Sequence, residues 1–110
     1  AFGTSVAAFQ NTQFKLAELS AEVSSAEVFL DRCTELLLEG SLDSVTASKL
    51  KLLTTELQCK VADECLQLHG GWGYMWEYPV CRAFADARVQ RIYGGTNEIM
   101  KLIISRDLMS

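Results

Sequence analysis

A set of mostly apolar residues between positions 9 and 37 constrains the fold of this chain more than any other feature. They recur at alternating steps of three and four residues, which places them on one stripe of a helix. The spacing predicts a helix of about thirty residues, about 45 Å long, that ends near Gly40. The stripe consists of Phe9, Thr12, Leu16, Leu19, Val23, Ala26, Leu30, Cys33 and Leu37.

A second stripe predicts a second long helix, antiparallel to the first. Asp43 offers an N-cap for it, and the glycine pair Gly70–Gly71 ends it. A short connection between two long helices favours an antiparallel pair. The second stripe consists of Leu50, Leu53, Leu57, Val61, Cys65 and Leu68.

Two shorter helices complete the predicted fold. Pro79 suits the first turn of a third helix, and Thr96 can cap a fourth. No strand-like alternation is present, so we expect an all-α fold: an up-down antiparallel helical bundle of two long and two shorter helices. Inward positions are expected at Val80, Phe84 and Ala87, with Val89 as a further candidate, and the fourth helix carries Ile99, Leu102, Ile103 and Met109.

The apolar stripe at 9–37 is longer than its predicted partners can cover. The third and fourth helices are too short to shield both long helices. We therefore expect a further helix, supplied by another segment or another chain. The chain is expected to be one domain, residues 1–110, of something larger.

Composition limits the classes of function. The chain has 110 residues, enough for one domain. Its net charge is −4 and its pI is near 4.9, which argues against nucleic acid or an anionic membrane as the main partner. No apolar run reaches the length of a membrane span, and the N-terminal stretch lacks the features of an export signal. The four cysteines form no C-x-x-C pair and are expected to be reduced thiols.

Two glycine-rich turns, "GGWG" and "YGGT", are candidate ligand-facing segments. Glycine lets a backbone approach a ligand closely, and a helix start offers N–H groups to oxygen or phosphate. The alternative is structural: a helix C-cap at Gly70–Gly71 and an ordinary interhelical turn at Gly94–Gly95. Spacing alone favours the structural alternative.

The remaining candidate residues also have plain structural explanations. His69, the only histidine, is expected to bind the last carbonyls of a helix, since no second ligand stands at metal-binding spacing. Glu98 complements a helix dipole whatever its function. The alternating aromatics Trp72, Tyr74, Trp76 and Tyr78 either cover a helix end or contact a flat ligand or partner.

Taken together, three segments resemble the C-terminal helical domain of acyl-CoA dehydrogenases, most closely the long-chain type. They are "AFGTSVAAFQNTQFKLAEL", "QLHGGWGYMWEYP" and "DARVQRIYGGTNEIMKLIISRD", which occur in family order and with family-like spacing. The resemblance implies an FAD-dependent enzyme that dehydrogenates acyl-CoA thioesters at the α and β carbons. It also implies a longer protein, with an N-terminal helical domain, a middle β domain and a first bundle helix preceding this chain.

Matching residues carry the family's contacts into this sequence. The resemblance implies FAD contacts within one subunit's site at Thr96, Asn97 and Glu98, and acyl-CoA contacts at Gly94 and Gly95. It implies contacts with the FAD of a neighbouring subunit at Phe2, Gln10, Gln67, Leu68, His69, Gly70 and Gly71.

Gly94 departs from the pattern of many family members, which have a glutamate there as the catalytic base. Glycine cannot act as a base, so no catalytic side chain is expected in this chain, and the base would lie upstream of Ala1. The backbone N–H of Gly94 would polarise the thioester carbonyl.

The resemblance further implies electron-transferring flavoprotein as a partner and a homo-oligomer, a dimer of dimers that shares FAD between subunits. It implies a location in the bacterial cytoplasm or the mitochondrial matrix. Two other classes stay open: a catalytically silent relative that serves as an interaction module, and a stand-alone helical protein whose glycine loops are only turns.

Overall fold

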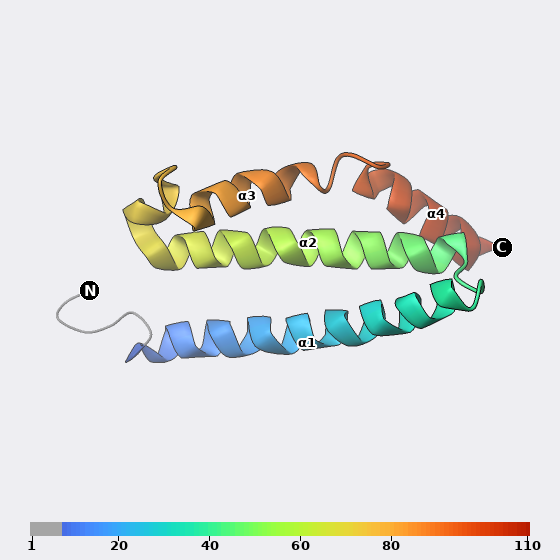
Figure 1. Ribbon diagram of the computed structural model, residues 1–110, viewed down its shortest axis with the longest axis horizontal. Coiled ribbons are helices and arrows are strands. Elements are labelled where there is room, and N and C mark those ends of the chain that lie inside the picture. Colours follow the sequence, from blue (N-terminus) through green and yellow to red (C-terminus); the bar gives the residue numbers. More distant parts are fainter. Residues whose placement is uncertain (1–7) are drawn as a thin grey trace.

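The computed structural model describes residues 8–110, and Phe2 lies outside this range. Four α-helices and a short 3-10 helix make up the fold (Figure 1), and no strand occurs within residues 8–110. The all-α prediction is therefore confirmed. None of the helices in this range is long and apolar enough to cross a membrane. The elements are α1 (Gln10–Leu38), α2 (Ser44–His69), η2 (Gly70–Tyr74), α3 (Pro79–Val89) and α4 (Asn97–Met109).

Helix α2 is the centre of the bundle. In Figure 1 it lies between α1 on one side and α3 with α4 on the other. The antiparallel pairing of α1 and α2 is confirmed by two ion pairs, Lys15 with Glu64 at 3.5 Å and Lys60 with Glu22 at 2.7 Å. Lys15 precedes Glu22 in α1, whereas its partner Glu64 follows Lys60 in α2, and this reversed order is that of an antiparallel pair.

Most helix ends follow the expected capping chemistry. The Asp43 carboxylate accepts a hydrogen bond from the Thr46 N–H at 3.1 Å and so caps α2. Gly40, just after α1, has a φ of +73° that favours glycine. Pro79 occupies the first turn of α3, where its missing N–H leaves no donor unsatisfied.

The apolar stripe of α1 divides into two rows with different surroundings. One row repeats every seven residues and is buried: Thr12, Leu19, Ala26 and Cys33. A seven-residue period keeps one face of a helix against a neighbour. In the other row, Val23 is half-buried and four members are exposed: Phe9, Leu16, Leu30 and Leu37. Within the described part of the chain, about half of the predicted stripe is therefore buried.

Helix α3 packs against α2, and Ala87 is its one buried residue. Ala87 is 1% exposed, and its carbonyl oxygen lies 3.2 Å from the Cys59 thiol of α2. The inward prediction for Ala87 is confirmed. The one for Val89 is wrong, since that side chain, the last of α3, is 48% exposed. All four cysteines are free thiols.

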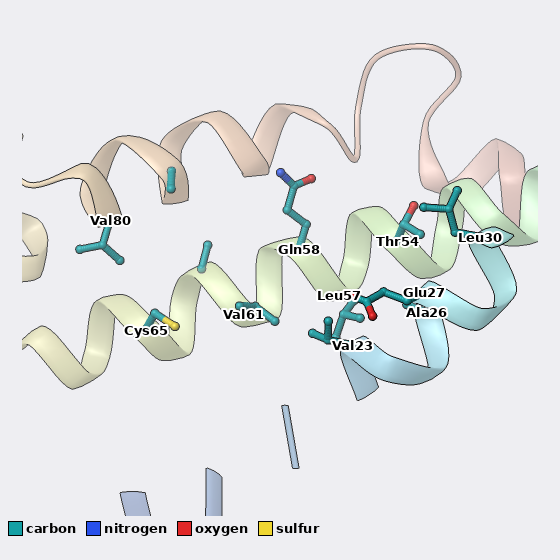
Figure 2. A pocket seen from close by; sticks show the side chains of 12 residues that line it. Val23, Ala26, Glu27, Leu30, Thr54, Leu57, Gln58, Val61, Cys65 and Val80 are labelled. Carbon is teal, nitrogen blue, oxygen red and sulfur yellow. The ribbon is translucent and has the colours of Figure 1, made fainter. Parts of the chain in front are cut away.

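An apolar groove of about 500 Å³ runs where α1, α2 and α3 meet (Figure 2). Apolar residues from all three helices form most of its walls, while Glu27, Thr54 and Gln58 add the polar atoms. Its apolar lining consists of Val23, Ala26, Leu30, Leu57, Val61, Ala62, Cys65, Val80 and Ala83. Exposed apolar surface of this extent favours association.

The 110-residue chain is expected to self-associate through this groove. Leu30→Glu places a charge on the groove wall and should shift sedimentation velocity profiles toward the monomer. Val28→Glu is the matched control, because Val28 is 69% exposed and outside the groove lining. A chain that stays monomeric at all concentrations, with and without Leu30→Glu, would contradict this expectation.

Candidate functional site

In the turn between α3 and α4, the chain presents bare backbone at two glycines. Gly94 and Gly95 have φ values of +68° and +89°, a region that residues with a Cβ rarely adopt. Both glycines are exposed. Thr96 follows as the N-cap of α4, and its hydroxyl accepts a hydrogen bond from the Ile99 N–H at 3.3 Å. The prediction that Thr96 caps the fourth helix is confirmed.

Asn97, the first residue of α4, is 1% exposed. Its side-chain amide nitrogen donates to the Thr55 hydroxyl at 3.0 Å and to the Glu56 carboxylate at 2.9 Å, both on α2. Its backbone N–H donates to the Arg91 carbonyl at 3.0 Å. A buried amide without such partners would be costly, so these bonds fix the start of α4 against α2.

Two charged side chains complete this polar network. The Arg91 guanidinium donates through Nε to Oε1 of Glu56 at 2.9 Å. The Lys51 ammonium donates to the Gly95 carbonyl at 2.6 Å and to Oδ1 of Asn97 at 2.9 Å. We call Lys51, Thr55, Glu56, Arg91 and Asn97 the α2–α4 network.

The network also sets the charge state of Glu56. The hydrogen bond from Asn97, with the positive charges of Arg91 and Lys101, lowers the pKa of the Glu56 carboxyl below its ordinary value of 4.5, although burial opposes this in part. Glu56 is therefore an acceptor at neutral pH. Its charge is satisfied by Arg91 and Asn97, which makes it a structural carboxylate.

The second glycine turn closes α2. Nδ1 of His69 lies 2.8 Å from the Cys65 carbonyl, so the ring donates to one of the last carbonyls of the helix, as predicted. Gly70 follows with a φ of +63°. Gln67, His69, Gly70 and Gly71 are exposed, whereas Leu68 is half-buried.

The predicted site residues form two separate groups. Gln67–Gly71 lie where α2 passes into η2, and the exposed Gln10 is the first residue of α1. The start of α1 lies beside this end of α2 (Figure 1). Gly94–Glu98 lie beyond α3, whose 11 residues span about 16 Å. Within one chain the two groups do not meet. Such a separation suits contacts with two different bound molecules.

The sequence reading missed Gly73, which is buried against the end of α2. A Cβ at this position would overlap the Leu66 carbonyl oxygen and lie 2.9 Å from the His69 Cβ. By contrast, a Cβ at Gly71 would have nothing within 4 Å. Of the aromatic residues, Tyr74, Trp76 and Tyr78 are exposed, while the side chain of Trp72 lies outside the described part of the structure.

Comparison with known proteins places the chain in a family. Residues 1–109 match the family model described as acyl-CoA dehydrogenase, C-terminal domain. The chain is 56% identical over 110 residues to the mitochondrial long-chain specific acyl-CoA dehydrogenase of Mus musculus, covering 100% of this chain and 26% of that protein. The chain therefore belongs to the acyl-CoA dehydrogenase family and corresponds to its C-terminal domain. It spans about a quarter of the length of such relatives.

Solved structures agree with this assignment. An acyl-CoA dehydrogenase from Geobacillus kaustophilus has a TM-score of 0.94 at 45% identity, over 98% of this chain and 28% of that one. A structure described as the electron transferring flavoprotein of Acidaminococcus fermentans contains a chain with a TM-score of 0.92 at 31% identity. That match covers 99% of this chain and 29% of the other.

The charge of Glu56 is expected to stabilise the fold in a pH-dependent way. Because its folded pKa is lowered, the stabilisation is complete above pH 4.5 and is lost as the pH falls through the folded pKa. Glu56→Gln should lower the free energy of unfolding by about 1 kcal/mol at pH 7, and this difference from wild type should shrink below pH 4.5.

Urea unfolding over a range of pH values measures this difference. Glu35→Gln is the control, because Glu35 pairs with Arg32 on an exposed surface and should change stability by only a few tenths of a kcal/mol, roughly. If Glu56→Gln lowered the free energy of unfolding equally at low and neutral pH, the carboxylate charge would not be the source of the stabilisation.

Gly73→Ala is expected to destabilise the junction of α2 and η2. Its Cβ meets backbone, which cannot move aside cheaply, so the cost should be about 1–3 kcal/mol. Gly71→Ala is the matched control, since the space beside it is open and its φ is not positive. Thermal unfolding of the two variants measures the difference; equal melting temperatures would contradict the clash.

Proposed function

We propose that this chain is the C-terminal domain of an FAD-dependent acyl-CoA dehydrogenase that forms an α,β double bond in acyl-CoA thioesters. The observation that carries the proposal is the exposed turn at Gly94–Gly95, held against α2 by the α2–α4 network. It occurs in a chain that matches the family's C-terminal domain over residues 1–109.

In this proposal Gly94 acts through its backbone. Its N–H donates to the thioester carbonyl and stabilises the charge that builds up there as the α-proton leaves. No side chain at position 94 can accept that proton, so a carboxylate outside this chain serves as the base. A Cβ at Gly94 would have nothing within 4 Å, and this open space supports room for long or branched acyl groups.

The residues proposed to hold FAD suit close approach of a large ligand. Gln10, Gln67, His69 and the glycines of the α2 end are exposed, and a Cβ at Gly70 or Gly71 would meet nothing within 4 Å. Thr96 and Glu98 frame the start of α4, where N–H groups favour phosphate or carbonyl oxygens. Asn97 contributes through this helix start, because its side chain is bound to α2. FAD would accept the β-hydride.

The exposed group at the end of α2 is proposed to contact the FAD of a neighbouring subunit in a homo-oligomer, since it does not meet the Gly94–Gly95 turn within one chain. The electron acceptor is proposed to be an electron-transferring flavoprotein, supported by the likeness to a chain in the Acidaminococcus fermentans structure. The mitochondrial location of the mouse relative supports the matrix, with the bacterial cytoplasm as the counterpart.

The test of this function uses the full-length protein that carries the chain. We expect it to purify with the absorbance of bound flavin and to reduce that flavin when an acyl-CoA is added. Flavin without any reaction toward acyl-CoA thioesters would favour the silent interaction module. Full-length protein that holds no flavin would overturn the proposal.

Gly94→Glu tests whether the open space serves the acyl group. A glutamate would fill it, so turnover of the longest or branched acyl-CoAs should fall about tenfold more than that of short ones. Gly94→Ala is the matched control, because it carries the same strain from a φ of +68° but a small side chain. An unchanged chain-length preference, measured as kcat/KM across a series of acyl-CoAs, would contradict the idea.

A further inference from the structure

The Gly94–Gly95 turn is held at both ends by one carboxylate oxygen. Arg91, before the glycines, donates to Oε1 of Glu56 at 2.9 Å, and Asn97, after them, donates to the same atom at 2.9 Å. The Arg91 carbonyl accepts from the Asn97 N–H at 3.0 Å. The ends of the turn are therefore tied to each other and to one point on α2.

The glycines between these ends need a further constraint. Glycine populates positive and negative φ with similar ease, so the ends alone leave the two central peptide groups several conformations. Lys51 reaches into the turn from α2 and donates to the Gly95 carbonyl at 2.6 Å. A hydrogen bond from a charged donor is stronger than one between neutral groups, and it holds the Gly95–Thr96 peptide group, to which this carbonyl belongs, in one orientation.

The position of Lys51 is itself well determined. Its ammonium also donates to Oδ1 of Asn97 at 2.9 Å, and that amide is fixed in turn by Thr55 and Glu56. Asn97 is 1% exposed and Thr55 is 8% exposed. The donor that binds the glycine backbone therefore belongs to a network with a buried centre.

We propose that Lys51 is a positioning residue for the dehydrogenation: by binding the Gly95 carbonyl, it restricts the conformations of the two glycines and so keeps the Gly94 N–H directed at the acyl thioester. This inference rests on the proposed function. A donor to a developing oxyanion acts only when it is already aimed at that oxygen, and a misplacement of about 1 Å can cost about a hundredfold in rate. Lys51 acts through the backbone of the turn, at the Gly95 carbonyl.

The experiment uses the full-length holoenzyme and a 3-thia-acyl-CoA, in which sulfur replaces the β-methylene so that no hydride can leave. Exchange of its α-protons in D₂O reports acidification of the α-carbon without turnover. Lys51→Met should slow this exchange about tenfold, while the Kd of the thioester changes less than about twofold, because ground-state binding is retained.

Lys49→Met is the matched control: it removes the same charge from an exposed position on the same helix and should leave α-proton exchange unchanged. Lys51→Arg keeps the charge and should restore most of the rate. A second readout is amide hydrogen exchange in residues 91–97, which should become faster in Lys51→Met than in Lys49→Met. A residue that only stabilised the fold would change melting temperature without this local effect.

The outcomes separate the two proposals. If the wild-type holoenzyme exchanges no α-protons, the proposed function fails. If it does exchange them and Lys51→Met equals Lys49→Met in both readouts, the positioning role is overturned and the proposed function stands. Should Lys51→Met fail to fold, Lys51→Gln, which keeps a donor but loses the charge, is compared with Lys49→Met by the same criteria.

Discussion

The buried amide of Asn97 is the contact on which the arrangement of the C-terminal half depends. An amide side chain that is 1% exposed must find partners for both its donors and its acceptor, and α2 supplies them through Lys51, Thr55 and Glu56. These donors and acceptors are directional, so α4 can begin at only one register along α2. The position of the turn before α4 is therefore also set by α2.

The opposite side of α2 is held by interactions of another kind. There α1 buries the row Thr12, Leu19, Ala26 and Cys33, and its ion pairs with α2 lie on the surface, where such pairs contribute little. Apolar packing is non-directional. The polar contacts on one face of α2 therefore fix the position of α4. The contacts on the other face bury apolar side chains of α1 and leave an apolar groove beside them.

The helices could be predicted well from the sequence because the interactions that cap their ends are local. The caps at Asp43 and Thr96 need only neighbouring residues. The α2–α4 network could not be predicted in this way: Lys51 and Glu56 have the spacing of ordinary surface charges, and their partners lie far along the chain. Likewise nothing local showed that Asn97, taken as a ligand contact, would be buried with its side chain bound to α2.

The polar contacts beneath this turn hold a backbone that has no side chain to pack at positions 94 and 95. A residue with a side chain could lock itself in place by packing, but Gly94 and Gly95 have none to pack, and their positive φ values exclude most substitutions. In the proposed enzyme the group that this turn contributes to catalysis is a backbone N–H donor, whose direction is set by the conformation of the turn alone. The direction of such a donor is only as well defined as the contacts that hold its backbone, and those contacts come from α2.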